Sequence, residues 1–182
     1  MIKKNKEILF FLAMVRLQFP FEDEEGAIDY LKNIIENDNY DFEALIIKWY
    51  LQYYYYRKTD DDFYRLINWD WKSSYKKAIV KYIMSCVVEK ESLKEKYILE
   101  SIKEYPKLVY PYEKLGNLYY RKGLKVKAKE CFMEAVKNIK TTEIKKHEVI
   151  NKQVFIDEYI TGVSMSEVNL ISLKKKLETS HE

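Results

Sequence analysis

The residues that could do chemistry are few and stand far apart in this chain. It has two cysteines, Cys86 and Cys131, and two histidines, His147 and His181. Neither histidine has a cysteine or a carboxylate at the spacing of zinc ligands. Cys131 and His147 could in principle pair as nucleophile and base. However, Cys131 directly precedes Phe132 in an apolar helical pattern, which is typical of an inert buried thiol.

Recognised catalytic patterns are absent from the sequence: it has no HExxH, no glycine-rich phosphate loop and no GxSxG. The acidic run Asp60-Asp61-Asp62 has two interpretations. It could bind a cation, or it could begin a helix, where aspartates cap backbone N–H groups and face the positive end of the macrodipole. We favour capping. The sequence therefore predicts no enzyme, no metal and no cofactor.

The apolar run at the N-terminus is similar to a signal peptide but is not followed by a cleavage site. Three lysines precede residues 8–15, and Arg16 follows at once without a small-x-small cleavage site. The run is also too short to cross a membrane. We interpret it as a buried first helix. Together with two distant cysteines, which suggest no disulfide framework, this predicts a cytoplasmic protein without a membrane partner.

Composition favours helices as the elements that position these residues. The 182 residues include only four glycines and three prolines, and 47% of them are hydrophobic. Tight turns are therefore few, and the apolar content supports a real core. The length suits one domain or one short stack of repeats.

A large-and-small pattern gives the most informative spacing. Tyr112-x-x-Leu115-Gly116-x-x-Tyr119 is followed by Ala128-x-x-x-Phe132-x-x-Ala135, which sets large residues against small ones on two consecutive helices. The position of Tyr112 recurs every 34 residues, at Ala78, Ala44 and Phe10. A fixed period across four units indicates a repeat protein.

This pattern resembles the tetratricopeptide repeat (TPR), a helix-turn-helix unit of 34 residues. The resemblance implies an all-α fold, a right-handed superhelical stack of antiparallel helix pairs. We expect about four hairpins and C-terminal capping helices in a single domain over residues 1–182. The expected units are about 7–40, 41–74, 75–108 and 109–142, with a cap over about 143–178.

Helix boundaries follow from the period. We expect helices over 8–18 and 24–36, 41–56 and 61–68, 74–88 and 93–105, and 109–121 and 124–139. Two small positions of the second unit are filled by Lys48 and Asp60, and the second helix of the first unit fits only after a one-residue shift. Gly162 is the expected stop of a further helix, and Ser164-x-x-Glu167 has the form of a capping box for a last one.

The resemblance also implies where a partner would bind. In such stacks the first helix of each pair lines the concave face. The positions of this chain that match are Trp49, Gln52 and Tyr53; Lys76, Ile79 and Ile83; and Asn117, Tyr120 and Arg121, with Glu113 beside them. Family members that clamp a terminal carboxylate use Lys and Asn at set positions. Only Asn117 matches, and Glu113 replaces the Lys, so that ligand is not predicted.

Four successive tyrosines, residues 53–56, add contact area near this face, although packing within the protein would explain them equally well. The leading prediction is a non-enzymatic protein–protein interaction module that binds a partner protein or peptide through its concave face. Self-association into a homo-oligomer stays open.

The uneven distribution of charge supports two alternative functions. Residues 21–70 hold thirteen acidic and five basic side chains, whereas residues 114–152 hold eleven basic and four acidic ones. The acidic residues within 22–43 and 60–62 would suit an immunity or antitoxin protein that blocks a cognate toxin. The basic region 114–152 could contact RNA phosphates. We rank nucleic acid below protein as a partner because no dedicated RNA-binding motif is present.

Overall fold

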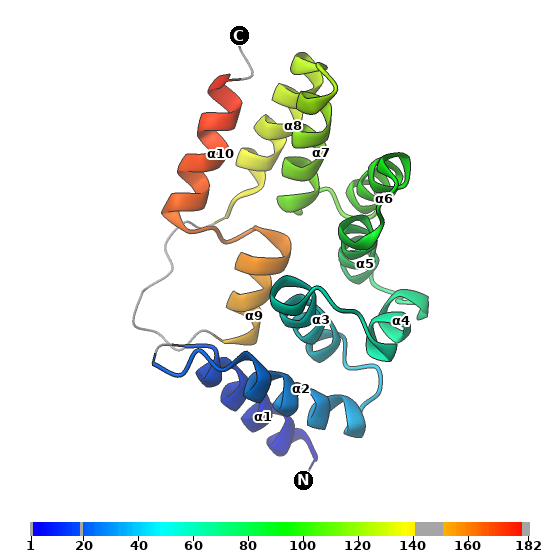
Figure 1. The fold of residues 1–182 in the computed structure, drawn as a ribbon, viewed down its shortest axis with the longest axis vertical. Helices are drawn as coiled ribbons and strands as arrows, with labels where there is room; N and C mark the ends of the chain where they lie inside the picture. Colours follow the sequence, from blue (N-terminus) through cyan, green and yellow to red (C-terminus); the bar gives the residue numbers. More distant parts are fainter. Residues whose placement is uncertain (1, 19, 141–150, 180–182) are drawn as a thin grey trace. The chain divides into compact units, whose positions relative to one another are not determined.

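The computed structural model describes residues 2–18, 20–140 and 151–179, and their regular elements are helices (Figure 1). The predicted all-α fold of paired helices is confirmed. Spatial proximity divides the chain into two compact units. Unit 1 comprises Met1–Trp69 and Lys145–Ile156, and unit 2 comprises Asp70–Ile144 and Asp157–Glu182. The expectation of a single domain over 1–182 stays a prediction.

Unit 1 contains two hairpins and one short helix from the C-terminal part of the chain. Successive helices in sequence pack against each other, and the short helix packs on the first one. Its helices are α1 (Ile2–Arg16), α2 (Glu24–Asn37), α3 (Phe42–Tyr56), α4 (Asp61–Asn68) and α9 (Lys152–Phe155). The bounds of α4 match the prediction.

Aspartates begin three of these helices by capping free backbone N–H groups. Asp23 accepts a hydrogen bond from the Gly26 N–H at 2.8 Å, and Asp41 accepts one from Ala44 at 2.8 Å. Asp60 accepts from the N–H groups of Asp62 and Phe63 at 3.1 and 3.2 Å. The capping interpretation of the acidic run is therefore confirmed at Asp60.

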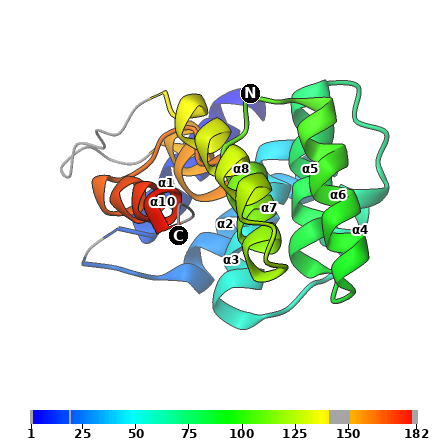
Figure 2. The same ribbon diagram turned by 90° about the horizontal axis from the view of Figure 1, so that it is seen from above.

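Unit 2 contains two further hairpins and the C-terminal helices. Figure 2 shows α5 beside α6 and α7 beside α8, and α10 packs on α8. The helices are α5 (Ser74–Val87), α6 (Glu91–Glu104), α7 (Tyr110–Arg121), α8 (Lys125–Asn138) and α10 (Glu167–Thr179). A π-helix, η1 (Ile156–Thr161), follows α9 directly, and all but its first residue belongs to unit 2.

Small residues lie where the repeat pattern predicts close approach. Ala128 and Ala135 of α8 are fully buried in one cluster with Phe132. In the preceding hairpin, the Ser101 hydroxyl donates to the Ala78 carbonyl at 2.7 Å across α5 and α6. The spacing therefore positions helix backbones close together in both hairpins of unit 2.

The first helix begins six residues earlier than predicted and is buried on one face only. Lysine is a good helix former, so α1 extends back to Ile2. Phe10, Ala13 and Met14 are buried, whereas Ile8 and Phe11 are more than half exposed. No helix in the described part of the chain has the length and apolar content required to span a membrane.

The C-terminal boundaries differ by two residues from the capping-box expectation. Ser166, not Ser164, caps α10, because its hydroxyl accepts from the Asn169 N–H at 3.4 Å. The Ser164 N–H donates instead to the Asp157 carbonyl at 3.2 Å. Gly162 ends η1 with a positive φ of 75°, as expected for a helix stop. The first part of the expected cap, residues 143–150, lies outside the described residues.

Candidate partner-binding site

The three predicted site residues of unit 1 lie together on α3. The Trp49 indole is buried and stacks on the Tyr53 ring with centroids 5.5 Å apart. The Arg57 guanidinium lies 5.5 Å from the centre of the same Tyr53 ring. Gln52 donates from Nε2 to an Asp60 carboxylate oxygen at 3.0 Å. These contacts hold the Trp49 and Tyr53 rings, which we call the aromatic row, in place along the C-terminal half of α3.

The indole N–H of Trp49 has no hydrogen-bond acceptor among the described residues, although the side chain is only 5% exposed. Buried indole N–H groups usually find a partner, because water cannot satisfy them. The site therefore contains one donor whose hydrogen bond is not made within the described structure.

The predicted residues of α5 lie mostly in the interior. Ile79 and Ile83 are fully buried, so neither contributes to an exposed face. The Lys76 ammonium lies 5.3 Å from the centre of the Trp71 ring, a cation–π contact. Of the three, Lys76 alone keeps partial exposure.

On α7 the predicted residues form a half-open surface. Tyr120 is 46% exposed, Asn117 is half-buried, and the Arg121 guanidinium lies 3.6 Å from a Glu91 carboxylate oxygen. Glu113 accepts a hydrogen bond from Lys176 of α10 at 2.6 Å. The Glu113 carboxylate is therefore paired within unit 2.

The tyrosine run continues the aromatic row into solvent. Tyr54, Tyr55 and Tyr56 are exposed at the end of α3. Burial and then the nearby Glu24 charge raise the pKa of Tyr55, while burial and then Glu25 raise the pKa of Tyr56. These tyrosines therefore lie close to the acidic start of α2.

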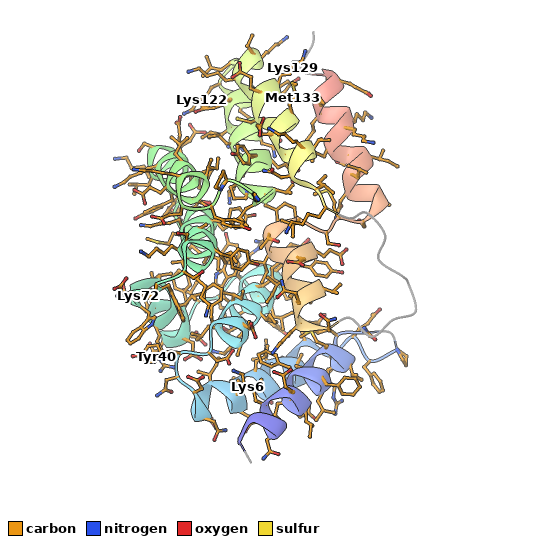
Figure 3. The ribbon with its side chains drawn as sticks, turned by 180° about the vertical axis from the view of Figure 1, so that it is seen from behind. Lys6, Tyr40, Lys72, Lys122, Lys129 and Met133 are labelled. Carbon is orange, nitrogen blue, oxygen red and sulfur yellow. The ribbon has the colours of Figure 1, made fainter. Side chains whose placement is uncertain are left out.

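A second exposed aromatic contact was not predicted as part of a site. The rings of Tyr40 and Trp69 stack with centroids 3.8 Å apart, and both are more than 40% exposed. Tyr40 lies in the turn between α2 and α3, as Figure 3 shows. The Trp69-Asp70-Trp71 segment was the available signal, since tryptophan is highly buried on average and two tryptophans follow a short predicted helix.

Part of the basic region forms ion pairs within the chain. Lys122 donates to Glu95 at 2.6 Å, and Lys137 lies 3.2 Å from Glu134. On α8, Lys129 and the exposed Met133 are neighbours four residues apart (Figure 3). Pairing with acids reduces the positive charge that this region could offer to phosphates.

The two cysteines, the candidate nucleophiles of this chain, have different surroundings. Burial, and then the nearby Glu130 charge, raise the pKa of the Cys131 thiol to about 11. The Lys114 ammonium lies 3.0 Å from the Cys86 sulfur. His147 and His181 lie outside the described residues. Within the described residues, no three His, Cys, Asp or Glu side chains group as metal ligands would.

Comparison with known proteins bears on the fold. No protein-family model and no curated protein sequence matches this chain. Among solved structures, the crystal structure of MamA protein, a TPR-like helical-repeat protein, is similar. The TM-score is 0.54 and the identity is 16%, over 98% of this chain and 93% of the MamA chain. At this identity the likeness shows a helical-repeat fold and nothing about the partner.

Proposed function

We propose that this chain is a non-enzymatic interaction module that binds a partner protein or peptide through the first helices of its hairpins. Helical repeats suit this role because paired helices present extended binding surfaces. On α3 the proposed site consists of the buried Trp49 and the half-buried Gln52 and Tyr53, and it continues into exposed tyrosines. Aromatic side chains provide large contact area with few rotatable bonds, as is common at recognition sites.

The unpaired indole N–H of Trp49 is the observation that carries this proposal. An unsatisfied buried donor costs about 1–3 kcal/mol. A backbone carbonyl of a bound peptide would supply the missing acceptor and recover this free energy on binding. Because the N–H is buried, a neighbouring side chain must turn aside first. The half-exposed Tyr53 ring, stacked on the indole, is suited to that movement.

The test removes the donor and keeps an aromatic ring at the same position. Trp49→Phe keeps a large ring but lacks the N–H, and we expect it to weaken partner binding by about tenfold, which corresponds to about 1.4 kcal/mol. Affinity purification with mass spectrometry would identify partners of the unaltered chain. A titration with each purified partner would then compare the two affinities.

Trp69→Phe is the matched control, because the same change at an exposed indole leaves the α3 site intact. We expect its partner affinity to equal that of the unaltered chain. Tyr120→Ala tests whether α7 contributes to the same partner. Equal affinities for the Trp49→Phe variant and the unaltered chain, with unchanged unfolding midpoints, would refute the role of Trp49.

A further inference from the structure

In unit 1, a Lys and a Phe from α9 contact the first helices of both hairpins. The Lys152 ammonium lies 2.7 Å from a Glu7 carboxylate oxygen of α1 and 3.1 Å from one of Glu43 of α3. It also lies 4.3 Å from the centre of the Phe10 ring. Two carboxylates and one aromatic face thus surround a single cation.

Phe155 makes the second contact, one helical turn beyond Lys152. Its ring is 5% exposed and meets the Tyr50 ring of α3 edge to face, with centroids 5.4 Å apart. Residues three apart lie on the same side of a helix, so the two side chains point toward the same surface. We call Glu7, Phe10, Glu43 and Tyr50 the α1–α3 receptor.

The segment that fills this receptor fits it incompletely. A cavity of about 400 Å³ lies beside it, lined by α1 residues and by Asn151, Lys152 and Gln153. Phe11 at its edge is 55% exposed, and the Glu7 side chain is 65% exposed. α9 itself has only four residues before the chain continues as a π-helix. A single α-helical turn has little stability of its own, so its position depends on the Lys152 and Phe155 contacts.

We propose that the α1–α3 receptor is a recognition site for helical segments with Lys-x-x-Phe spacing, and that α9 occupies it as an internal competitor. A partner with a basic residue and an aromatic residue on one helix face would displace α9 and could also fill the adjacent cavity. The acidic pair and the Phe10 ring select the cation, and Tyr50 selects the aromatic ring. The inference rests on the proposed function only in assuming a protein or peptide partner, since its receptor does not include Trp49.

A peptide with the sequence of residues 151–161, fluorescently labelled, is the probe. Anisotropy titrations would compare the unaltered full chain with the release variant Lys152→Ala/Phe155→Ala. An internal segment competes at a high effective concentration, so removing its anchors exposes the receptor to the probe. We expect the release variant to bind the peptide at least about tenfold more tightly than the unaltered chain.

Exchanging the charges of the receptor and the probe tests whether their ion pairs determine binding. In the release variant, adding Glu7→Lys and Glu43→Lys should abolish binding of the probe. A peptide with Glu in place of its Lys should then bind this variant and not its parent. A peptide lacking the aromatic ring should bind neither. Recovery by exchanged charges cannot result from a general loss of structure.

Equal peptide affinities for the unaltered chain and a folded release variant would overturn the proposal, as would affinity that ignores the charge exchange. If the release variant does not fold, Lys152→Ala alone replaces it, under the same two criteria. Trp49-dependent partner capture is measured separately. If the probe peptide binds but partner binding does not depend on Trp49, only the proposed α3 site is wrong. If partner binding depends on Trp49 but the probe peptide does not bind, only the α1–α3 receptor is wrong.

Discussion

Gly116 of α7 faces the ring of Phe132 of α8 so closely that no side chain fits between them. A Cβ placed on Gly116 would lie 2.5 Å from Cε1 of the Phe132 ring. Both residues are buried. Protein interiors are packed without spare volume, so α7 and α8 can pack this closely only because Gly116 has no side chain.

We predict that Gly116→Leu lowers the free energy of unfolding by roughly 1–3 kcal/mol or more, because the added side chain must displace the ring or separate the helices. Urea denaturation followed by circular dichroism would measure the change. Glu130→Ala, an exposed change on α8, is the control and should have an effect within about 0.5 kcal/mol. Unchanged stability of Gly116→Leu would mean that this repeat register is wrong.

The equivalent contact in the second hairpin is an ion pair. Lys48 and Asp60 stand two 34-residue periods before Gly116 and Ala128, where the pattern prefers small residues. The Lys48 side chain is almost fully buried, and its ammonium contacts Asp60 and lies 2.5 Å from Asp62. A charged pair thus joins α3 to the start of α4 in place of close backbone packing.

Removing the charges of Asp60 and Asp62 should lower the free energy of unfolding more than removing these charges and that of Lys48 together. Asp60→Asn with Asp62→Asn keeps the capping oxygens but leaves the buried Lys48 ammonium without an opposite charge. We predict a loss of about 3 kcal/mol in unfolding free energy. Adding Lys48→Met should recover most of it, because a buried apolar chain needs no counter-charge. Chemical denaturation of the unaltered chain, the Asp60→Asn/Asp62→Asn variant, Lys48→Met alone and the combined variant tests this, and additive effects would contradict it.

The ion pair between Lys48 and Asp60 also predicts that stability depends on pH. Burial alone would raise the pKa of Asp60, but hydrogen bonds from Lys48 and Gln52 outweigh it and lower the pKa below its ordinary 3.8. The unfolded state therefore takes up this proton first as pH falls. The stabilisation is present above the ordinary pKa of 3.8 and is lost progressively as the pH falls through the lower pKa of the folded state.

Urea midpoints at pH 5, 4 and 3 would test this dependence. We expect the stability of the unaltered chain relative to Lys48→Met to decline across this range, since Lys48→Met lacks the interaction that lowers the pKa. A relative stability that stays constant with pH would show that Lys48 does not control this titration.

Helix positions were predictable because they depend on local rules. Apolar spacing and aspartate caps placed α4 correctly, and the 34-residue period placed the helices of the last two hairpins to within two residues. The one-residue shift in α2 is confirmed by the burial of Ala27, Leu31 and Ile34. Each of these features is determined within a few turns of chain.

The surroundings of the candidate site were less predictable because they depend on distant segments. The resemblance in the sequence predicts that Ile79 and Ile83 face a groove, yet both are fully buried. Nothing near Lys48 in sequence shows that Asp60 and Asp62 will pair with it. Likewise, the Lys152 contacts with Glu7 and Glu43 join residues more than a hundred positions apart. A single sequence carries no direct signal for such pairs.

Thiol reactivity provides a final prediction that separates an inert core cysteine from a nucleophile. With a pKa of about 11, only about one Cys131 thiol in a thousand is ionised at pH 8, and the thiolate is the form that alkylates. Cys86 is partly exposed and lies beside the Lys114 ammonium. We therefore expect iodoacetamide at pH 8 to modify Cys86 at least about tenfold faster in the native chain.

Peptide mapping by mass spectrometry at successive times would give both rates. In denaturant, the two cysteines should react at similar rates, because unfolding removes the burial that raises the pKa of Cys131. Rapid native modification of Cys131 would instead show an accessible thiolate, and the pairing of Cys131 with His147 would then need a direct test. Slow modification would agree with its place beside Phe132 in the apolar face of α8, where the side chain contributes packing.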